Sequence, residues 1–243
     1  MKQVIVLGSI SFLILSTLIF MRVAYGQRTV GVSPGDWFIW GDLEVTWNCS
    51  DPSLDPMIEE LKNLNSSSAF VCRIKNVSGT NITVEGGFHF LNGTQQNVTS
   101  IQDVREGLLF ISAGLSAGET LGEIGYLADF TINETIMKEY TGIERETNHL
   151  NYSISDVIND TCYEDKSNYY WDKVTGVLVE KFEWALVMNQ TFYLEYCMHL
   201  KLVETNVWEI IHLISIGDEE FEITTLSNSS IAAIQFNMTT KTL

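Results

Sequence analysis

The segment Gly114-Leu115-Ser116-Ala117-Gly118 matches the GxSxG pattern of serine hydrolases. In those enzymes the serine lies on a sharp turn between a strand and a helix, within a parallel α/β sheet. The residues before Ser116 fit a strand, but the glycine-containing stretch 119–129 makes a poor helix, and no HGGG-like oxyanion segment precedes it. We interpret the segment as a small-residue turn and keep a hydrolase using Ser116 as the least favoured alternative.

Histidines and carboxylates give no catalytic or metal-binding pattern. The four histidines, His89, His149, His199 and His212, lack HExxH or HxH spacing. The acidic run Asp218–Glu222 lacks the alternating, glycine-containing loop of a calcium site, so we interpret it as a solvated surface. Glycosidases use a pair of carboxylates, but a chain with 31 acidic residues contains many such pairs by chance. Their presence therefore does not indicate a glycosidase. We therefore predict no catalytic residue, no metal and no cofactor.

Potential N-glycosylation sites are the strongest functional signal in the sequence. Twelve of the sixteen asparagines occupy Asn-x-Ser/Thr sequons, whereas the share of serine and threonine would give about three by chance. Each glycosylated asparagine must be exposed, because a glycan cannot be buried. We expect several of these sites to be glycosylated: Asn48, Asn65, Asn76, Asn81, Asn92, Asn97, Asn133, Asn151, Asn159, Asn189, Asn228 and Asn237.

The four cysteines form an even set without a C-x₂-C unit. If the chain is exported, two disulfides are the expected state. Three connectivities are open, and sequence proximity favours Cys49 with Cys72 and Cys162 with Cys197.

The first 26 residues have the form of a signal peptide or an N-terminal membrane anchor. Lys2 precedes an uncharged, mostly apolar stretch from Val4 to Phe20, and small residues precede a plausible cut before Gln27. About 17 such residues are also the lower limit for a membrane span, so both alternatives stay open. Either one predicts an extracellular or cell-surface protein, which contacts the membrane only through this segment and only if the segment is uncleaved.

The chain is acidic, with a net charge of −17. Nucleic acids and anionic membrane surfaces require basic patches, so we expect neither as a partner.

The remaining pattern predicts a mainly β domain over 27–215 and a short β tail over 216–243. Alternation over 42–47 predicts a strand, and Asp55-Pro56 predicts the start of one of at most two short helices. Further predicted strands lie within 69–77, 82–90, 98–101, 106–112, 130–141, 143–154 and 191–204, with a hairpin over 168–184. Short turns between alternating strands predict one antiparallel sheet with a wet face, and a β-sandwich is the alternative.

The hairpin NYYWDKVTGVLVEKFEW combines turn residues with aromatic ones. Asp172 can accept backbone hydrogen bonds, and Gly176 can take the positive φ that closes the turn. The aromatic residues are expected mainly in the core. The candidates for a ligand-lined cavity are Trp37, Trp40, Phe110, Trp171 and Trp184.

The order of GDW at 35–37, NVSGTNITV at 76–84, NGT at 92–94, GIERETNHLNYS at 142–153 and YYWDKVTGVLVE at 169–180 resembles a family of uncharacterised archaeal secreted or surface-anchored proteins. The tail GDEEFEITTLSNSSIAAIQFN is similar to a β-module at the C-terminal side of related archaeal surface proteins, and here it would be a reduced or truncated second module. By analogy, the resemblance implies a strongly curved half-barrel like that of lipoprotein carriers.

These observations favour a non-catalytic, N-glycosylated cell-envelope protein with a structural, adhesion or recognition role. Other envelope proteins or glycans are its expected partners. The alternative is a carrier that holds an apolar or lipid-like ligand in the concave side of the sheet.

Overall fold

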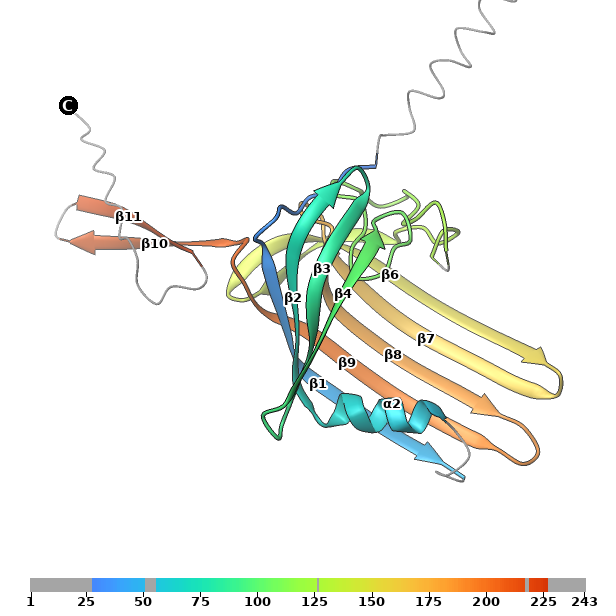
Figure 1. Ribbon diagram of the computed structural model, residues 1–243. Helices are drawn as coiled ribbons and strands as arrows, with labels where there is room; N and C mark the ends of the chain where they lie inside the picture. Colours follow the sequence, from blue (N-terminus) through green and yellow to red (C-terminus); the bar gives the residue numbers. More distant parts are fainter. Residues whose placement is uncertain (1–27, 51–55, 126, 217–218, 227–243) are drawn as a thin grey trace, which may run out of the picture.

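The computed structural model describes residues 28–50, 56–125, 127–216 and 219–226 (Figure 1). The predicted targeting segment and most of the tail lie outside them. No helix among the described residues is long and apolar enough to cross a membrane. The elements are β1 (Trp37–Cys49), α2 (Pro56–Asn65), β2 (Ser67–Ser78), β3 (Asn81–Phe90), β4 (Gln95–Asp103), β5 (Glu134–Tyr140), β6 (Ile143–Ile158), β7 (Thr161–Asp172), β8 (Leu178–Met188), β9 (Tyr193–Thr205), β10 (Glu209–Ile216) and β11 (Glu219–Leu226).

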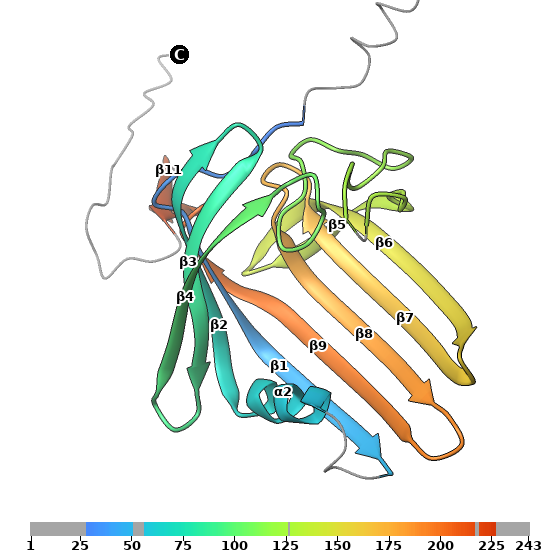
Figure 2. The same cartoon turned by 45° about the vertical axis from the view of Figure 1, so that its right-hand side comes forward.

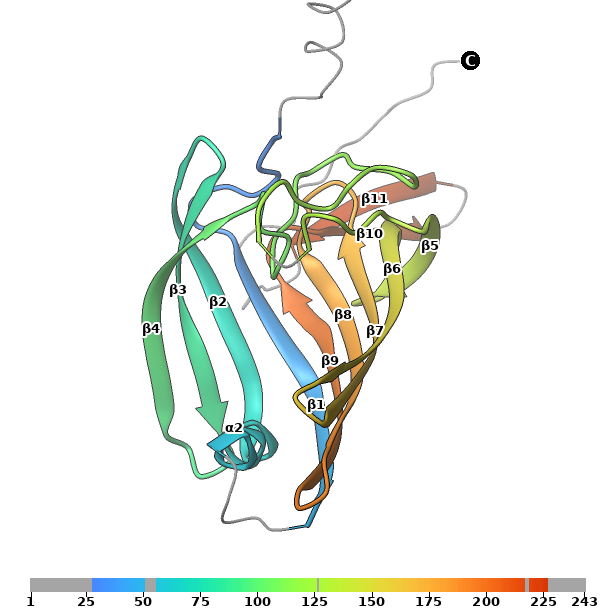
Figure 3. The ribbon, with the colours of Figure 1, turned by 90° about the vertical axis from the view of Figure 1, so that its right-hand side faces the viewer.

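Nine strands form one antiparallel sheet in the order β4-β3-β2-β1-β9-β8-β7-β6-β5. The sheet does not close into a barrel, and Figures 2 and 3 show it curled into an open trough. The predicted curved antiparallel sheet is therefore confirmed, and the sandwich alternative is wrong. Strands β10 and β11 pair as a separate hairpin that extends away from the sheet in Figure 1.

The curvature of the trough centres on β1. This strand pairs with β2 only over Trp37–Trp40, but with β9 as far as Cys49. Between Gly41 and Glu44 the register with β9 shifts, and Asp42 takes a positive φ of 46°. A bulge of this kind bends a strand and increases its twist. Beyond the bulge β1 continues beside β9 alone, and α2 lies at the end where β1 and β2 have parted (Figure 2).

The inner side of the trough, which we call the concave face, holds the core. At one end the loop 104–133 packs over strands β6 to β8, with Ile111, Leu121 and Leu127 of the loop buried against Leu150 and Trp171. At the other end α2 packs on β1 and β9. Its apolar residues Ile58 and Leu61 are buried against Val45 and Leu194, as expected for a short amphipathic helix. The opposite side is the convex face.

The predicted hairpin over 168–184 is confirmed. The Asp172 carboxylate has no solvent exposure and accepts hydrogen bonds from the backbone N–H and hydroxyl of Thr175, at 2.8 and 2.7 Å. Gly176 has a φ of 72°, as its place in the turn requires. Arg145 on β6 donates to the same carboxylate at 2.8 and 3.2 Å, which makes a cross-strand ion pair.

The strand predicted over 106–112 is wrong. Its residues cross the end of the sheet and form only an isolated bridge between Phe110 and Val177. The backbone nevertheless docks on the β7–β8 turn, because Ile111 donates to the carbonyl of Gly176 and Leu178 donates to that of Leu109. The run of apolar residues in this segment therefore reflects burial against a turn.

We expect Asp172→Asn to lower the free energy of unfolding by roughly 3 kcal/mol, because it leaves the Arg145 charge without its buried partner. This value is near the low end for such a change, since Arg145 keeps 22% exposure and can be partly hydrated. Urea unfolding measures the loss. Lys75→Ala is the control, because it breaks an exposed cross-strand pair with Glu85 and should cost no more than about 1 kcal/mol. Equal losses would contradict the importance of the buried pair.

Candidate functional site

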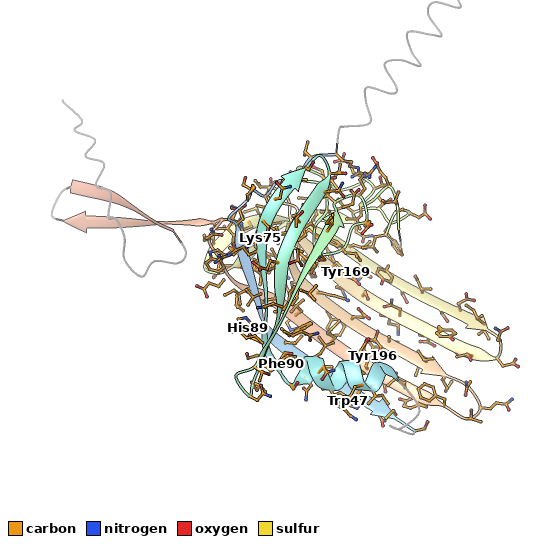
Figure 4. All side chains as sticks on the ribbon, viewed as in Figure 1. Trp47, Lys75, His89, Phe90, Tyr169 and Tyr196 are labelled. Atoms are coloured by element: carbon orange, nitrogen blue, oxygen red, sulfur yellow. The ribbon has the colours of Figure 1, made fainter. Side chains whose placement is uncertain are left out.

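The middle of the concave face carries a cluster of tyrosines and charges from β7, β8 and β9. Lys181 forms an ion pair with Glu183, and the Tyr196 hydroxyl donates to Glu183 at 2.5 Å. The Lys181 ammonium also lies 5.2 Å from the centroid of the Tyr169 ring. In Figure 4, Tyr196 lies beside α2, together with its cross-strand partner Trp47, and Tyr169 lies nearer the loop end of the trough.

The ionisation of this cluster favours binding over acid–base chemistry. Burial opposes the charge on Lys181, but the neighbouring Tyr169 and Glu183 outweigh it and raise the pKa of the ammonium. Burial and the bond to Glu183 raise the pKa of Tyr196 far above its usual range. At neutral pH the cluster therefore presents a charged ammonium and protonated phenols. The Lys181 ammonium and the Tyr169 hydroxyl can donate hydrogen bonds to a ligand, whereas the Tyr196 hydroxyl already donates to Glu183. All three groups are poor proton acceptors.

A second feature of the concave face is an apolar hollow of about 260 Å³ on strands β2, β3 and β4. Phe70, Phe88 and Val98 line it. The consecutive glycines of β3 allow close packing of the strands, because a Cβ on Gly86 would lie 2.1 Å from the Val71 carbonyl oxygen and one on Gly87 would lie 1.5 Å from that of Gln96. The Gly86-Gly87 pair is thus a feature of the sequence that could have indicated the hollow, although strand alternation alone does not.

The five predicted cavity-lining aromatics do not meet in one cavity. Trp40 and Trp171 have no solvent exposure and Phe110 has 2%, so all three belong to the packed core. Trp37 and Trp184 are half-buried on the convex face, where the indole of Trp184 donates to Glu195 at 2.8 Å. Of the two tryptophans of the hairpin, Trp171 thus serves in packing and Trp184 lies on the convex face.

Ser116 lies in a turn of the loop 104–133. Its backbone N–H donates to the Glu119 carboxylate at 2.8 Å, and the neighbouring Ala117 donates to Thr135. The loop contains no helix in its described residues, and no hydrogen bond there joins Ser116 to a histidine. The strand, turn and helix of a hydrolase nucleophile are therefore not formed around this residue.

Two histidines lie on the convex face beside carboxylates. His149 lies 2.9 Å from Glu134 and His199 lies 3.2 Å from Glu180, whereas His89 is half-buried on β3. The described part of the chain contains no group of three His, Cys, Asp or Glu side chains suited to a metal ion. The side chains of His212 and of the acidic run 218–222 lie outside the described residues.

The predicted disulfides are wrong, since all four cysteines are free. Cys72 lies opposite Phe38, eleven residues before Cys49 on β1, which corresponds to roughly 36 Å along a strand. Cys162 and Cys197 flank β8 at Met188 and Trp184, four residues or roughly 13 Å apart along it. Disulfides need Cα atoms about 4.4–6.8 Å apart, so neither pair can be bridged in this register.

All ten sequon asparagines within the described residues are exposed. Of the four asparagines outside sequons, only Asn63 is exposed, and Asn148 is fully buried. Three of the sequons inside strands, at Asn48, Asn97 and Asn151, project from the convex face, because their sequence neighbours pack on α2, line the apolar hollow or enter the core beneath the loop. These sequons therefore leave the concave face uncovered.

Comparison of the sequence with models of known protein families and with curated proteins finds no match.

We expect four thiols to react with Ellman's reagent when the protein is unfolded without a reductant, and Cys72 to react last in the native protein. Cys72 is 1% exposed, and burial raises the pKa of its thiol to about 12, so almost no reactive thiolate forms at pH 8. The half-buried Cys49 and Cys162 serve as the comparison. Fewer than four thiols in the unfolded chain would contradict the free cysteines.

Proposed function

We propose that the protein is an exported, N-glycosylated, non-catalytic cell-surface module that recognises envelope proteins or glycans through its concave face. The exposure of every described sequon asparagine is the observation that carries the proposal. Burial of even a few of them would have argued for chance enrichment in turns. The acidic surface adds support, because a net charge of −17 keeps an exported protein soluble and self-repelling.

The concave face is the favoured recognition surface within this proposal. It offers the hydrogen-bond donors of Lys181 and Tyr169 on β7 and β8 and an apolar hollow on β2 to β4, and binding sites commonly combine apolar walls with a few polar groups. The resemblance to archaeal surface proteins supports an archaeal source and a tail that belongs to a second module.

Mass spectrometry of the protein purified from its own cells tests the central claim. We expect glycan masses on several of the ten exposed sequon asparagines and a mature N-terminus near Gln27 if the first segment is cleaved. Asn63 is an internal control, because it is also exposed but lies outside any sequon and should stay unmodified. Unmodified asparagines throughout would refute the proposal.

A carrier of an apolar or lipid-like ligand is the second candidate, and the hollow of about 260 Å³ favours it. An apolar chain would contact Phe70, Phe88 and Val98 there, next to the buried Cys72.

If this hollow binds apolar molecules, Val98→Arg should weaken binding of a fluorescent fatty-acid probe at least tenfold. An arginine at the wall must either lose hydration or block the entrance. Val157→Arg is the matched control, since both valines are exposed on strands, at 58% and 67%, but Val157 lies on the convex face, far from the hollow. Equal binding by both variants and the unmodified chain would exclude the carrier.

A further inference from the structure

A second hollow, of about 390 Å³, lies on the convex face between β1 and β7. Its lining includes Glu44 and Thr46 from β1, Asn168 and Tyr170 from β7, Phe182 from β8 and His199 from β9. It is separate from the concave face, because these residues point to the other side of the same strands.

The strand register connects this hollow with a sequon. Asn151 pairs with Asn168, which pairs with Phe182, which pairs with His199. The Asn151 side-chain amide nitrogen, the atom that would carry a glycan, donates to the Asn168 side-chain oxygen at 2.8 Å. A glycan on Asn151 would therefore start at the rim of the hollow. Phe182 lies two strands away, or roughly 10 Å.

The lining suits a neutral sugar. Phe182 is an exposed aromatic at 39%, and an aromatic ring can pack against the apolar C–H face of a sugar. Carboxylates, amides and hydroxyls around it can bond the sugar hydroxyls. In the described part of the chain, no ion pair or side-chain hydrogen bond engages the Glu44 carboxylate or the Thr46 hydroxyl. The Glu44 charge would repel an anionic sugar.

Neighbouring contacts hold the border of the hollow in place. His149 stacks on Tyr170 with the ring centroids 4.3 Å apart, and the Lys138 ammonium lies 3.7 Å from the Tyr170 centroid. Lys138 also forms an ion pair with Glu180 at 2.6 Å. A lining that is already ordered needs less conformational entropy to bind a ligand.

We propose that this hollow is a carbohydrate site occupied by the first sugars of the glycan carried by Asn151. The proposal rests on the proposed N-glycosylation. An attached saccharide is favoured over a free one as the occupant. The covalent link gives the attached sugars a high effective concentration, so that even weak contacts in an open hollow suffice for binding. The glycan thereby covers Phe182 and adds to the stability of the convex face.

The test is a double-mutant cycle on the full chain purified from its own cells. Ser153→Ala removes the sequon of Asn151 but keeps Asn151 and its bond to Asn168. Phe182→Ala removes the aromatic surface. We expect Phe182→Ala to lower the melting temperature by about 2–4 °C more when the Asn151 glycan is present than when it is absent.

Thr99→Ala is the matched control, because it removes the sequon of Asn97 on the distant strand β4 and should show no coupling with Phe182→Ala. A glycan at Asn151 by mass spectrometry without coupling to Phe182 would overturn the docking but leave the proposed glycosylation intact. Absence of glycans from all sequons would instead refute both. A free neutral oligosaccharide should bind the Ser153→Ala protein more tightly than the glycosylated chain if the Asn151 glycan occupies the hollow. Tight binding of this oligosaccharide to the glycosylated chain would show that the hollow is free, and would overturn the Asn151 glycan as its occupant.

Discussion

The pairing of one fully buried carboxylate, that of Asp172, determines how the loop 104–133 covers its end of the trough. A buried charge is tolerated only when it is paired and hydrogen-bonded, and Arg145 from β6 together with Thr175 meets this condition. The backbone of the same residue closes the turn, since it accepts from Gly176 and donates to Val177. The turn then offers its own backbone groups to the loop 104–133. The covering of the core therefore depends on a local charge.

The bulge in β1 has the complementary role at the centre of the sheet. Because β1 leaves β2 after Trp40 but stays beside β9, the sheet bends, and α2 occupies the space that opens. Because side chains alternate along each strand, the two faces of the sheet carry different sets of side chains. The concave face receives the core, the tyrosine and lysine cluster and an apolar hollow, whereas the convex face receives the strand sequons and a polar hollow. One sheet thus carries two surfaces of different composition.

The elements that the sequence predicts correctly are those specified by neighbouring residues. The hairpin over 168–184 depends on Asp172 and Gly176, which act within the same turn, and the strands depend on alternation along a few residues. The segment 106–112 and the cysteine pairs were predicted wrongly, because both depend on which distant strands become neighbours. The cluster of Lys181, Glu183 and Tyr196 could not be found for the same reason, since it requires the register between β8 and β9.

An open sheet leaves two strands, β4 and β5, with one side of the backbone unpaired. Such an edge can recruit a strand from another molecule and begin aggregation. Here β4 is exposed over most of its length and begins with the polar sequence Gln95-Gln96-Asn97, while β5 carries Lys138 and Glu139 near its end. A second chain would have to displace water from these groups in order to pair. The trough can therefore remain unclosed and still resist self-association.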